Sequence, residues 1–405
     1  MGIIGKLLIC FTLVGYPVQY SNSVQSGYNS NDSYVSDYIT LLNEFPVNKQ
    51  GEGYEPSFPG ISEQPMTYGL LLSSESLHYM VSPNEDSKVR IKASTKWLLQ
   101  NIDLDQDGFL GWGLPQAWDA FGDGSVNPEN HPYTITTAIV MQGLLDALSI
   151  PSFWNAEEQS EIKKSLKTIS IQWSNKAWSE TPDGHGFFWY SPRVEDAHFC
   201  PNVSAMFLGM LSRVLKEHRD IFDAKEVSFI KTRVDSAAKS IVDKMISRNG
   251  LPYWNYIALP NVFNQNEPND LVHHAYILWG MELYRDSGGP IKITWTTEQA
   301  LKSLDSFWKD GKIFDYPMDQ KYTGTMESYN VRPGILWGPG MMLAVYARYG
   351  DGVRIKNTHE EIIKTYGPLS QLHIWPASFS QDQVFYARYA AHILYGLAIN
   401  TFKRK

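Results

Sequence analysis

The sequence predicts an all-α protein whose helices form an inner and an outer ring. Helical periodicity recurs along nearly all of its 405 residues, and two kinds of helix alternate strictly. One kind has a single apolar face, whereas the other is apolar nearly all round and must be surrounded by protein. Connections from the first kind to the second are long, and the return connections are short. These observations predict an (α/α)6 toroid, with amphipathic helices outside and apolar helices inside.

The predicted outer helices carry a narrow apolar stripe. In 157–178, Ile162, Leu166 and Ile169 lie on one face at helical spacing, with lysines elsewhere. Segment 225–248 has the same pattern, as do 88–102 and 297–309.

The predicted inner helices include 135–148 and 203–215, which have no polar face. Weaker helices complete the count, and no alternating strand pattern of useful length competes with them. The six predicted pairs are 33–44/65–80, 88–102/133–148, 157–178/200–217, 225–248/269–285, 297–309/333–349 and 357–365/384–401. We expect one domain over 24–405. Asn-Gly and Asp-Gly pairs recur after the outer helices, where we expect their left-handed turns to end each helix.

The N-terminal segment 1–23 resembles a signal peptide. Lys6 precedes an apolar run from Leu7 to Val14, then Pro17 and small polar residues. The run is shorter than the roughly 20 residues that span a bilayer. We expect an exported protein, periplasmic or extracellular, with no transmembrane segment in the mature chain.

Composition narrows the function further. The formal net charge is −8 and no long basic run occurs, so we expect no nucleic-acid partner. Aromatic residues make up 13% of the chain, which favours a cleft where rings stack on sugars. Only Cys200 remains after signal cleavage, and its apolar neighbourhood predicts a buried, inert thiol.

The long connections 103–132, 178–199, 249–268 and 310–332 all precede inner helices, so they gather on one face of the ring. Long connections are often functional. The helix N-termini on that face favour an anionic ligand, including the carboxylate of a uronic acid.

Three groups of residues on this face can move a proton at C5 of a uronic acid. Asn130, His131 and Tyr133 open one inner helix, Asn269 to His274 open another, and Tyr329 and Arg332 precede a third. Imidazole and phenol groups can act as acid and base, while amide and guanidinium groups hold the carboxylate. The predicted catalytic residues are His131, Tyr133, Asp270, His273 and Tyr329. The predicted substrate-binding residues are Trp112, Trp118, Asn130, Trp189, Tyr190, Trp254, Asn269, His274 and Arg332.

The run Asp103-Leu104-Asp105-Gln106-Asp107-Gly108 matches the opening of a calcium loop. Its twelfth position is Leu114 rather than glutamate, which excludes an EF-hand. A plain turn and a lone calcium site at Asp103, Asp105 and Asp107 both remain open. The predicted chemistry requires no other cofactor.

The alternating helix pairs and aromatic loops resemble the (α/α) toroid carbohydrate-active enzymes over nearly the whole mature chain. Asn130-His131-x-Tyr133 is similar to an element of alginate-lyase-like toroids, although their fuller Asn-Asn-His-Ser-Tyr-Trp run is missing. This group includes polysaccharide lyases, glucuronyl C5-epimerases, unsaturated glucuronyl hydrolases and several inverting glycosidases. The resemblance therefore implies a polysaccharide or oligosaccharide substrate, and within the group the His, Tyr and Asn residues above favour a lyase or C5-epimerase.

Two alternatives stay open. The first is an inverting glycoside hydrolase that uses two carboxylates in the same cleft. Its candidate carboxylates are Asp119, Asp123, Asp196, Asp270 and Glu327. The second is a non-catalytic glycan-binding toroid, in which the His and Tyr clusters only cap helices.

Overall fold

The computed structural model describes residues 33–56, 58–258, 267–379 and 384–402. The predicted signal peptide lies outside these residues. Residues 34–405 form one compact unit. In the described part of the chain, no helix is long and apolar enough to cross a membrane.

Helices of the two predicted kinds alternate along the described chain. The outer helices are α1 (Ser33–Leu42), α3 (Glu85–Gln100), α5 (Ala156–Lys176), α7 (Ala224–Asp243), α9 (Thr297–Asp305) and α11 (Gly352–Tyr366). The inner helices are α2 (Pro65–Val81), α4 (Thr134–Leu148), α6 (Pro201–Glu217), α8 (Leu271–Asp286), α10 (Trp337–Tyr349) and α12 (Ala387–Phe402).

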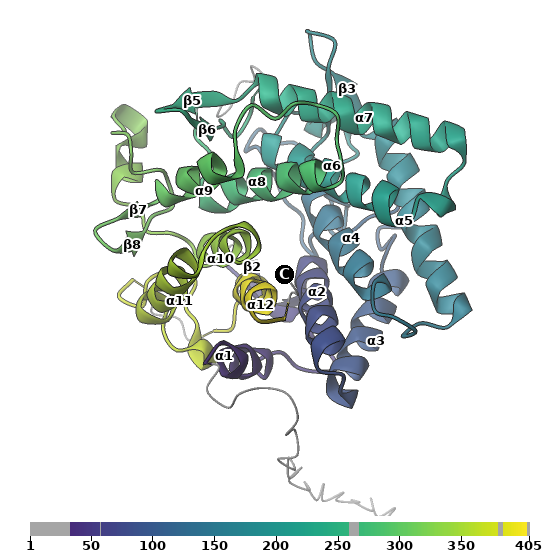
Figure 1. Cartoon of the computed structure of the whole chain (residues 1–405), viewed down its shortest axis with the longest axis horizontal. Helices are drawn as coiled ribbons and strands as arrows, with labels where there is room; N and C mark the ends of the chain where they lie inside the picture. Colours follow the sequence, from purple (N-terminus) through teal and green to yellow (C-terminus); the bar gives the residue numbers. More distant parts are fainter. Residues whose placement is uncertain (1–32, 57, 259–266, 380–383, 403–405) are drawn as a thin grey trace, which may run out of the picture. The chain divides into compact units, whose positions relative to one another are not determined.

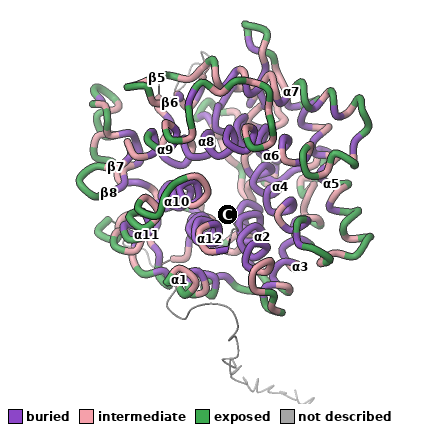
Figure 2. Tube along the Cα trace, viewed as in Figure 1, coloured by how far each residue is buried: buried purple, intermediate pink, exposed green. Residues whose placement is uncertain are grey.

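The inner helices form a closed ring. Each packs against the next in the order α2, α4, α6, α8, α10 and α12, and α12 packs back against α2. Figure 1 shows the outer helices around this ring. Figure 2 shows the inner helices almost wholly buried, while the outer helices expose one side. The predicted (α/α)6 toroid is confirmed.

Glycines set the spacing within the ring. A Cβ atom on Gly143 of α4 would lie 2.5 Å from the carbonyl oxygen of Gly69 on α2. A Cβ atom on Gly280 of α8 would lie 2.0 Å from the carbonyl oxygen of Ala205 on α6, and Gly396 of α12 faces Gly340 of α10 in the same way. The six inner helices therefore form three closely packed pairs, in which backbone approaches backbone.

The outer helices begin at well-formed caps. Asn155 and Glu158 form a capping box at α5, and Asp223 and Glu226 form one at α7. Each box satisfies backbone N–H groups that the first turn leaves unpaired.

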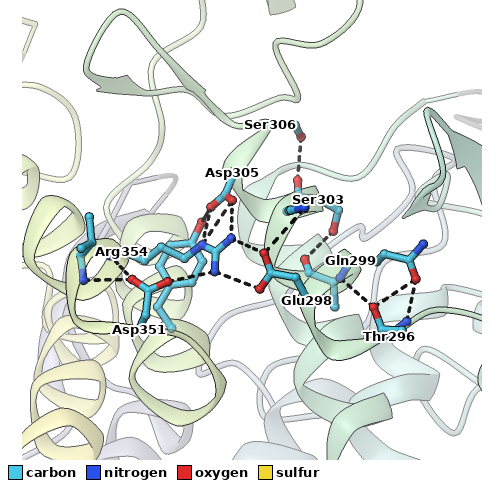
Figure 3. A network of polar contacts seen from close by, with 12 residues as sticks. Thr296, Glu298, Gln299, Ser303, Asp305, Ser306, Asp351 and Arg354 are labelled. Carbon is cyan, nitrogen blue, oxygen red and sulfur yellow. Dashed lines mark hydrogen bonds and ion pairs between the residues drawn. The ribbon is translucent and has the colours of Figure 1, made fainter.

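Ion pairs link neighbouring outer helices. Figure 3 shows Arg354 of α11 between Asp305 and Glu298 of α9. Its Nη2 atom lies 2.9 Å from an oxygen of each carboxylate, and Asp351 at the N-cap of α11 approaches Nη1 at 3.1 Å.

Four short hairpins lie between an outer helix and the next inner helix, where the sequence pattern indicated no useful strand. The predicted helices 225–248 and 297–309 are therefore too long: α7 ends at Asp243 and α9 at Asp305, and a strand of a hairpin follows each. The antiparallel pairs are β1 (Glu52–Glu55) with β2 (Phe58–Glu63), β3 (Trp178–Glu180) with β4 (Gly186–Phe188), β5 (Ile246–Arg248) with β6 (Leu251–Tyr253), and β7 (Trp308–Lys309) with β8 (Lys312–Ile313).

Three of the Asn-Gly and Asp-Gly pairs lie in the turns of these hairpins, Asp183-Gly184 between β3 and β4 and the other two in tight turns, so the expectation that they end helices is wrong. Asn249 and Gly250 have φ of 52° and 75°, and Asp310 and Gly311 have φ of 51° and 72°. Two successive residues with positive φ make the type I′ turn that joins twisted strands.

Candidate functional site

The centre of the candidate site is a carboxylate–imidazole pair at the start of α8. Asp270 is the N-cap of this helix and accepts a hydrogen bond from the backbone N–H of His273. The Nδ1 atom of His273 lies 2.8 Å from Oδ1 of Asp270, and both side chains are about one-fifth exposed. Burial alone would raise the pKa of Asp270, but His273 and then Arg332 outweigh it and hold this pKa below its usual value.

A second carboxylate lies beside Asp270 but is almost fully buried. The Oδ2 atom of Asp315 is 3.0 Å from Nε of Arg332, whose side chain is 45% exposed. Burial, and then the charge of Asp270, raises the pKa of Asp315 to about 8, against the opposing charge of Arg332. One guanidinium therefore pairs with a buried carboxylate while part of it still faces solvent.

Backbone hydrogen bonds hold these two carboxylates in place. The N–H of Leu271 donates to the carbonyl of Asp315 at 2.8 Å, and the N–H of Asp315 donates to the carbonyl of Arg332 at 3.0 Å. The start of α8 and the connection before α10 are thereby joined.

Tyr329 lies in the same region. Its ring stacks on that of Tyr316 with centroids 3.8 Å apart, and its hydroxyl donates to the Glu267 carboxylate. Burial, and then Glu267, raises the pKa of Tyr329 to about 12. The guanidinium of Arg332 lies 5.7 Å from the ring of Tyr316, which connects this pair of rings to Asp315.

A line of aromatic rings connects His273 to the start of α4. The ring of Tyr256 is 5.0 Å from that of His273, and the ring of Tyr190 is 5.6 Å from that of Tyr133. Tyr190 and Tyr256 adjoin closely enough to affect each other. Burial is the largest effect on both; beyond it, Tyr190 raises the pKa of Tyr256, whereas the side chain of Tyr256 lowers the pKa of Tyr190. Tyr133 itself is only 2% exposed. These contacts link the connections that precede α4, α6, α8 and α10 around the pair Asp270 and His273. Tyr133, however, is buried rather than open to a substrate.

His131, the other predicted catalytic residue at the start of α4, contacts Asp105 rather than the residues around His273. His131 is buried, and its Nδ1 atom lies 3.0 Å from Oδ2 of Asp105. The preceding Asn130 has a φ of 62°, which turns the chain just before Pro132 pairs with Gly113.

The predicted tryptophans divide into two groups. Trp112 and Trp254 are fully buried, and their indole N–H groups donate to the carbonyls of Leu98 and Ile241. Trp112 therefore packs in the core, and the expectation that it stacks on a sugar is not supported. Trp118 and Trp189 are partly exposed, with the Trp118 ring 5.8 Å from that of Phe58 on β2.

A pocket of about 220 Å³ adjoins the pair, between the β5–β6 hairpin and the segment before α10. Its walls include Arg248, Tyr253, Tyr322 and the predicted residues Trp254, Asn269 and His274. His274 is buried beneath it, bonds to Ser303 Oγ through Nε2, and has its pKa lowered to about 3 by burial and then by Arg248. His274 is therefore neutral at pH 7. Asn269 directly precedes Asp270, so the pocket and the carboxylate–imidazole pair are neighbours.

Sequence reasoning missed several buried polar residues beneath the pair. Tyr276 Oη lies 2.6 Å from Nε2 of His392, and Nδ1 of His392 donates to the carbonyl of Arg388. Arg388 pairs through two nitrogens with the carboxylate of Glu55 on β1. The one sequence signal for His392 was its polarity within the otherwise apolar helix α12. Asp315, set in the apolar run that follows Ile313, offered a similar signal.

The proposed hydrolase carboxylates are mostly engaged elsewhere. Asp119 accepts hydrogen bonds from the backbone of Gly122 and Gly124, Asp123 accepts from Ser125, and buried Asp196 accepts from Asn127. The remaining candidate with a clear carboxylate neighbour is Asp270, which lies beside Asp315, a residue outside the predicted set.

No protein-family model matches the chain, and a comparison with curated proteins finds no relative. Solved structures match almost its whole length. A sugar epimerase from a ruminal bacterium aligns with 90% of this chain and 98% of its own, at 12% identity and a TM-score of 0.55. A glycoside hydrolase family 76 mannosidase from Bacteroides thetaiotaomicron aligns with 91% of this chain and 96% of its own, at 11% identity and a TM-score of 0.55.

A GH8 xylobiose complex from Teredinibacter turnerae aligns with 92% of this chain and 93% of its own, at 13% identity and a TM-score of 0.51. At such identities the likeness concerns the fold. The chain has the fold of the (α/α) toroid carbohydrate-active enzymes.

Proposed function

We propose that this chain is a carbohydrate-active enzyme that moves a proton at C5 of a uronate sugar, as a lyase or C5-epimerase. The observation that carries the proposal is His273, a partly exposed imidazole in contact with the equally exposed carboxylate of Asp270, near the exposed guanidinium of Arg332. The toroid fold that it shares with a sugar epimerase and with glycosidases supports a carbohydrate substrate.

In this mechanism Arg332 binds the carboxylate of the sugar, which makes the C5 proton more acidic. His273 accepts that proton, and Asp270 stabilises the imidazolium that forms. In a lyase, the electron pair of the C5–H bond forms a C4–C5 double bond while the C4–O bond breaks, and Tyr329 protonates the leaving oxygen. In an epimerase, a proton returns to C5 from the opposite face. We assign no proton transfer to His131, because its side chain is only 9% exposed.

The test is incubation with a panel of uronate polymers. A lyase gives unsaturated ends, which ultraviolet absorbance detects. An epimerase incorporates solvent deuterium at C5 without changing chain length. His273→Ala should lower kcat by about 10²–10⁴, the range for a general acid or base. Full turnover by this variant would contradict the proposed role of His273.

An inverting glycoside hydrolase is the second candidate, because Asp270 and Asp315 have pKa values shifted in opposite directions. Two adjacent carboxyl groups with separated pKa values are the usual arrangement for a base and an acid. This activity would give new reducing ends without unsaturation. It would be lost in Asp315→Asn and largely kept in His273→Ala, the reverse of the first proposal. A glycan-binding toroid would give neither product.

We further propose that the protein is exported after cleavage near residue 23. The charged, apolar and small-residue segments at the N-terminus support this. Intact-mass measurement of secreted protein tests the cleavage, and a mass that still includes Met1 would contradict it.

A further inference from the structure

The connection between α3 and α4 brings two carboxylates and an imidazole together. We call Asp105, Asp107 and His131 the Asp105 cluster. One ligand atom from each residue lies within 4.8 Å of the other two. Two of the residues come from one turn, and the third comes from the segment just before α4.

The cluster has buried polar atoms that no group in the described part of the chain satisfies. The side chain of His131 is 9% exposed and that of Asp105 is 12% exposed. Beyond the contact between His131 Nδ1 and Asp105 Oδ2, the Nε2 atom of His131 and the Oδ1 atom of Asp105 are inaccessible and have no hydrogen-bond partner among the described residues. Buried polar groups are usually paired, so unpaired atoms on both members point to a missing ligand.

The backbone holds His131 in this position. A Cβ atom on Gly113 would lie 1.8 Å from the carbonyl oxygen of His131, so only glycine allows the two strands of this connection to approach. Gly113 and Pro132 also pair as an isolated β-bridge. The imidazole is therefore fixed against the Asp105 turn before any ligand binds.

We propose that the Asp105 cluster binds a divalent cation of the Zn²⁺ type, with Asp105, Asp107 and His131 as its protein ligands. One imidazole nitrogen and two carboxylates suit borderline ions such as Zn²⁺, whereas Ca²⁺ prefers oxygen ligands alone. Asp103, which a calcium loop would also use, does not belong to this group of ligand atoms among the described residues.

The cation would have a structural role that does not depend on the proposed function. It would fix the Asp105 turn to the residues that lead into α4, next to the buried Tyr133. The expected consequence is a more stable connection on one side of the candidate cleft.

The test uses the whole purified chain after dialysis against a chelator. Titration calorimetry and thermal unfolding are measured with Zn²⁺, Mn²⁺ and Ca²⁺ chlorides. We expect one Zn²⁺ per chain, tighter binding than Ca²⁺ by at least tenfold, and a higher Tm with Zn²⁺. His131→Gln and Asp107→Asn should lose this site, while Asp103→Asn and the control Asp123→Asn keep it.

Asp107 is exposed, so Asp107→Asn should fold normally, and far-ultraviolet circular dichroism of the metal-free variants checks this. The proposal is overturned if the dialysed chain binds no cation, or if both ligand variants bind Zn²⁺ as the parent does. It is also overturned if Ca²⁺ binds more tightly than Zn²⁺ and Asp103→Asn abolishes that binding.

Discussion

The Oδ1 atom of Asp270 contacts His273 twice, accepting the backbone N–H at 3.1 Å and lying 2.8 Å from Nδ1 of the imidazole. One oxygen atom therefore caps α8 and orients its candidate base. Asp270 thus has two roles, capping α8 and orienting His273. A substitution of Asp270 can test the second role alone only if the new side chain still caps the helix.

Asp270→Asn makes that separation. Asparagine caps helices as well as aspartate does, so the melting temperature should change little. Loss of the negative charge should lower kcat by about 10²–10⁴-fold, because the carboxylate both orients the imidazole and stabilises its protonated form.

Asp223→Asn is the matched control, because Asp223 caps the outer helix α7 in the same way. Steady-state kinetics and thermal unfolding of both variants test the prediction. Equal kcat in the two variants would show that Asp270 is only a cap.

Asp315 should make stability depend on pH. Its pKa is raised to about 8 in the folded chain, compared with about 3.9 in an unfolded one. Between these values the native state binds a proton that the unfolded state does not. The free energy of unfolding should therefore fall as pH rises from about 4 to 8.

Asp315→Asn removes this titration, so the variant should lose less stability than the parent between pH 5 and pH 9. Urea unfolding at the two pH values measures the difference. Parallel pH profiles for variant and parent would show that Asp315 is ionised throughout, as its pairing with Arg332 alone would favour.

Much of the fold was predictable because a helix with one buried face has apolar residues at helical spacing in the sequence. The stripe Ile162, Leu166 and Ile169 is buried as predicted, and α6 is buried nearly all round. The hairpins left no such trace: β5 and β6 have three residues each, too few for an alternating pattern to stand out.

The candidate site was predictable only in part, because it depends on contacts between distant connections. The spacing of Asp270 and His273 within one helical turn indicated their pairing. Nothing in the spacing of residues indicated that Asp315 would lie beside Asp270, or that His131 would face Asp105. Both contacts arise where long connections fold against one another.

Arg354→Gln should destabilise the outer ring modestly. Its side chain is largely buried, but the carboxylates that it contacts on α9 and at the N-cap of α11 are about half exposed (Figure 3). Water and salt screen such pairs, so we expect a loss of about 1 kcal/mol in the free energy of unfolding that shrinks at high salt.

Lys302→Gln is the control for this change. Lys302 is exposed, and its Nζ atom is as far as 4.0 Å from Oε1 of Glu298. Loss of this weak contact should have no measurable effect on stability. Denaturant unfolding at low and high salt compares the two variants. A similar small effect for both would mean that the Arg354 network does not hold α9 and α11 together.

Gly280→Ala should be the most damaging single-methyl change in the ring. The added Cβ atom would lie 2.0 Å from the carbonyl oxygen of Ala205 and 2.3 Å from its carbonyl carbon. These are backbone atoms of a buried neighbouring helix, so α6 and α8 must move apart and lose packing along their length. Overpacking of this kind commonly costs 1–3 kcal/mol, and we expect about 3 kcal/mol here, because no flexible side chain can yield.

Gly352→Ala tests whether the loss comes from crowding rather than from glycine replacement itself. Gly352 begins the outer helix α11, and a Cβ atom there meets nothing within 4 Å. Alanine should leave stability unchanged or raise it by about 0.5 kcal/mol, because it restricts the unfolded chain and favours helix. Denaturant unfolding of both variants measures the contrast. If Gly280→Ala is no less stable than Gly352→Ala, the α6–α8 contact is looser than the described backbone approach, and the glycine pairs do not set the spacing of the inner ring.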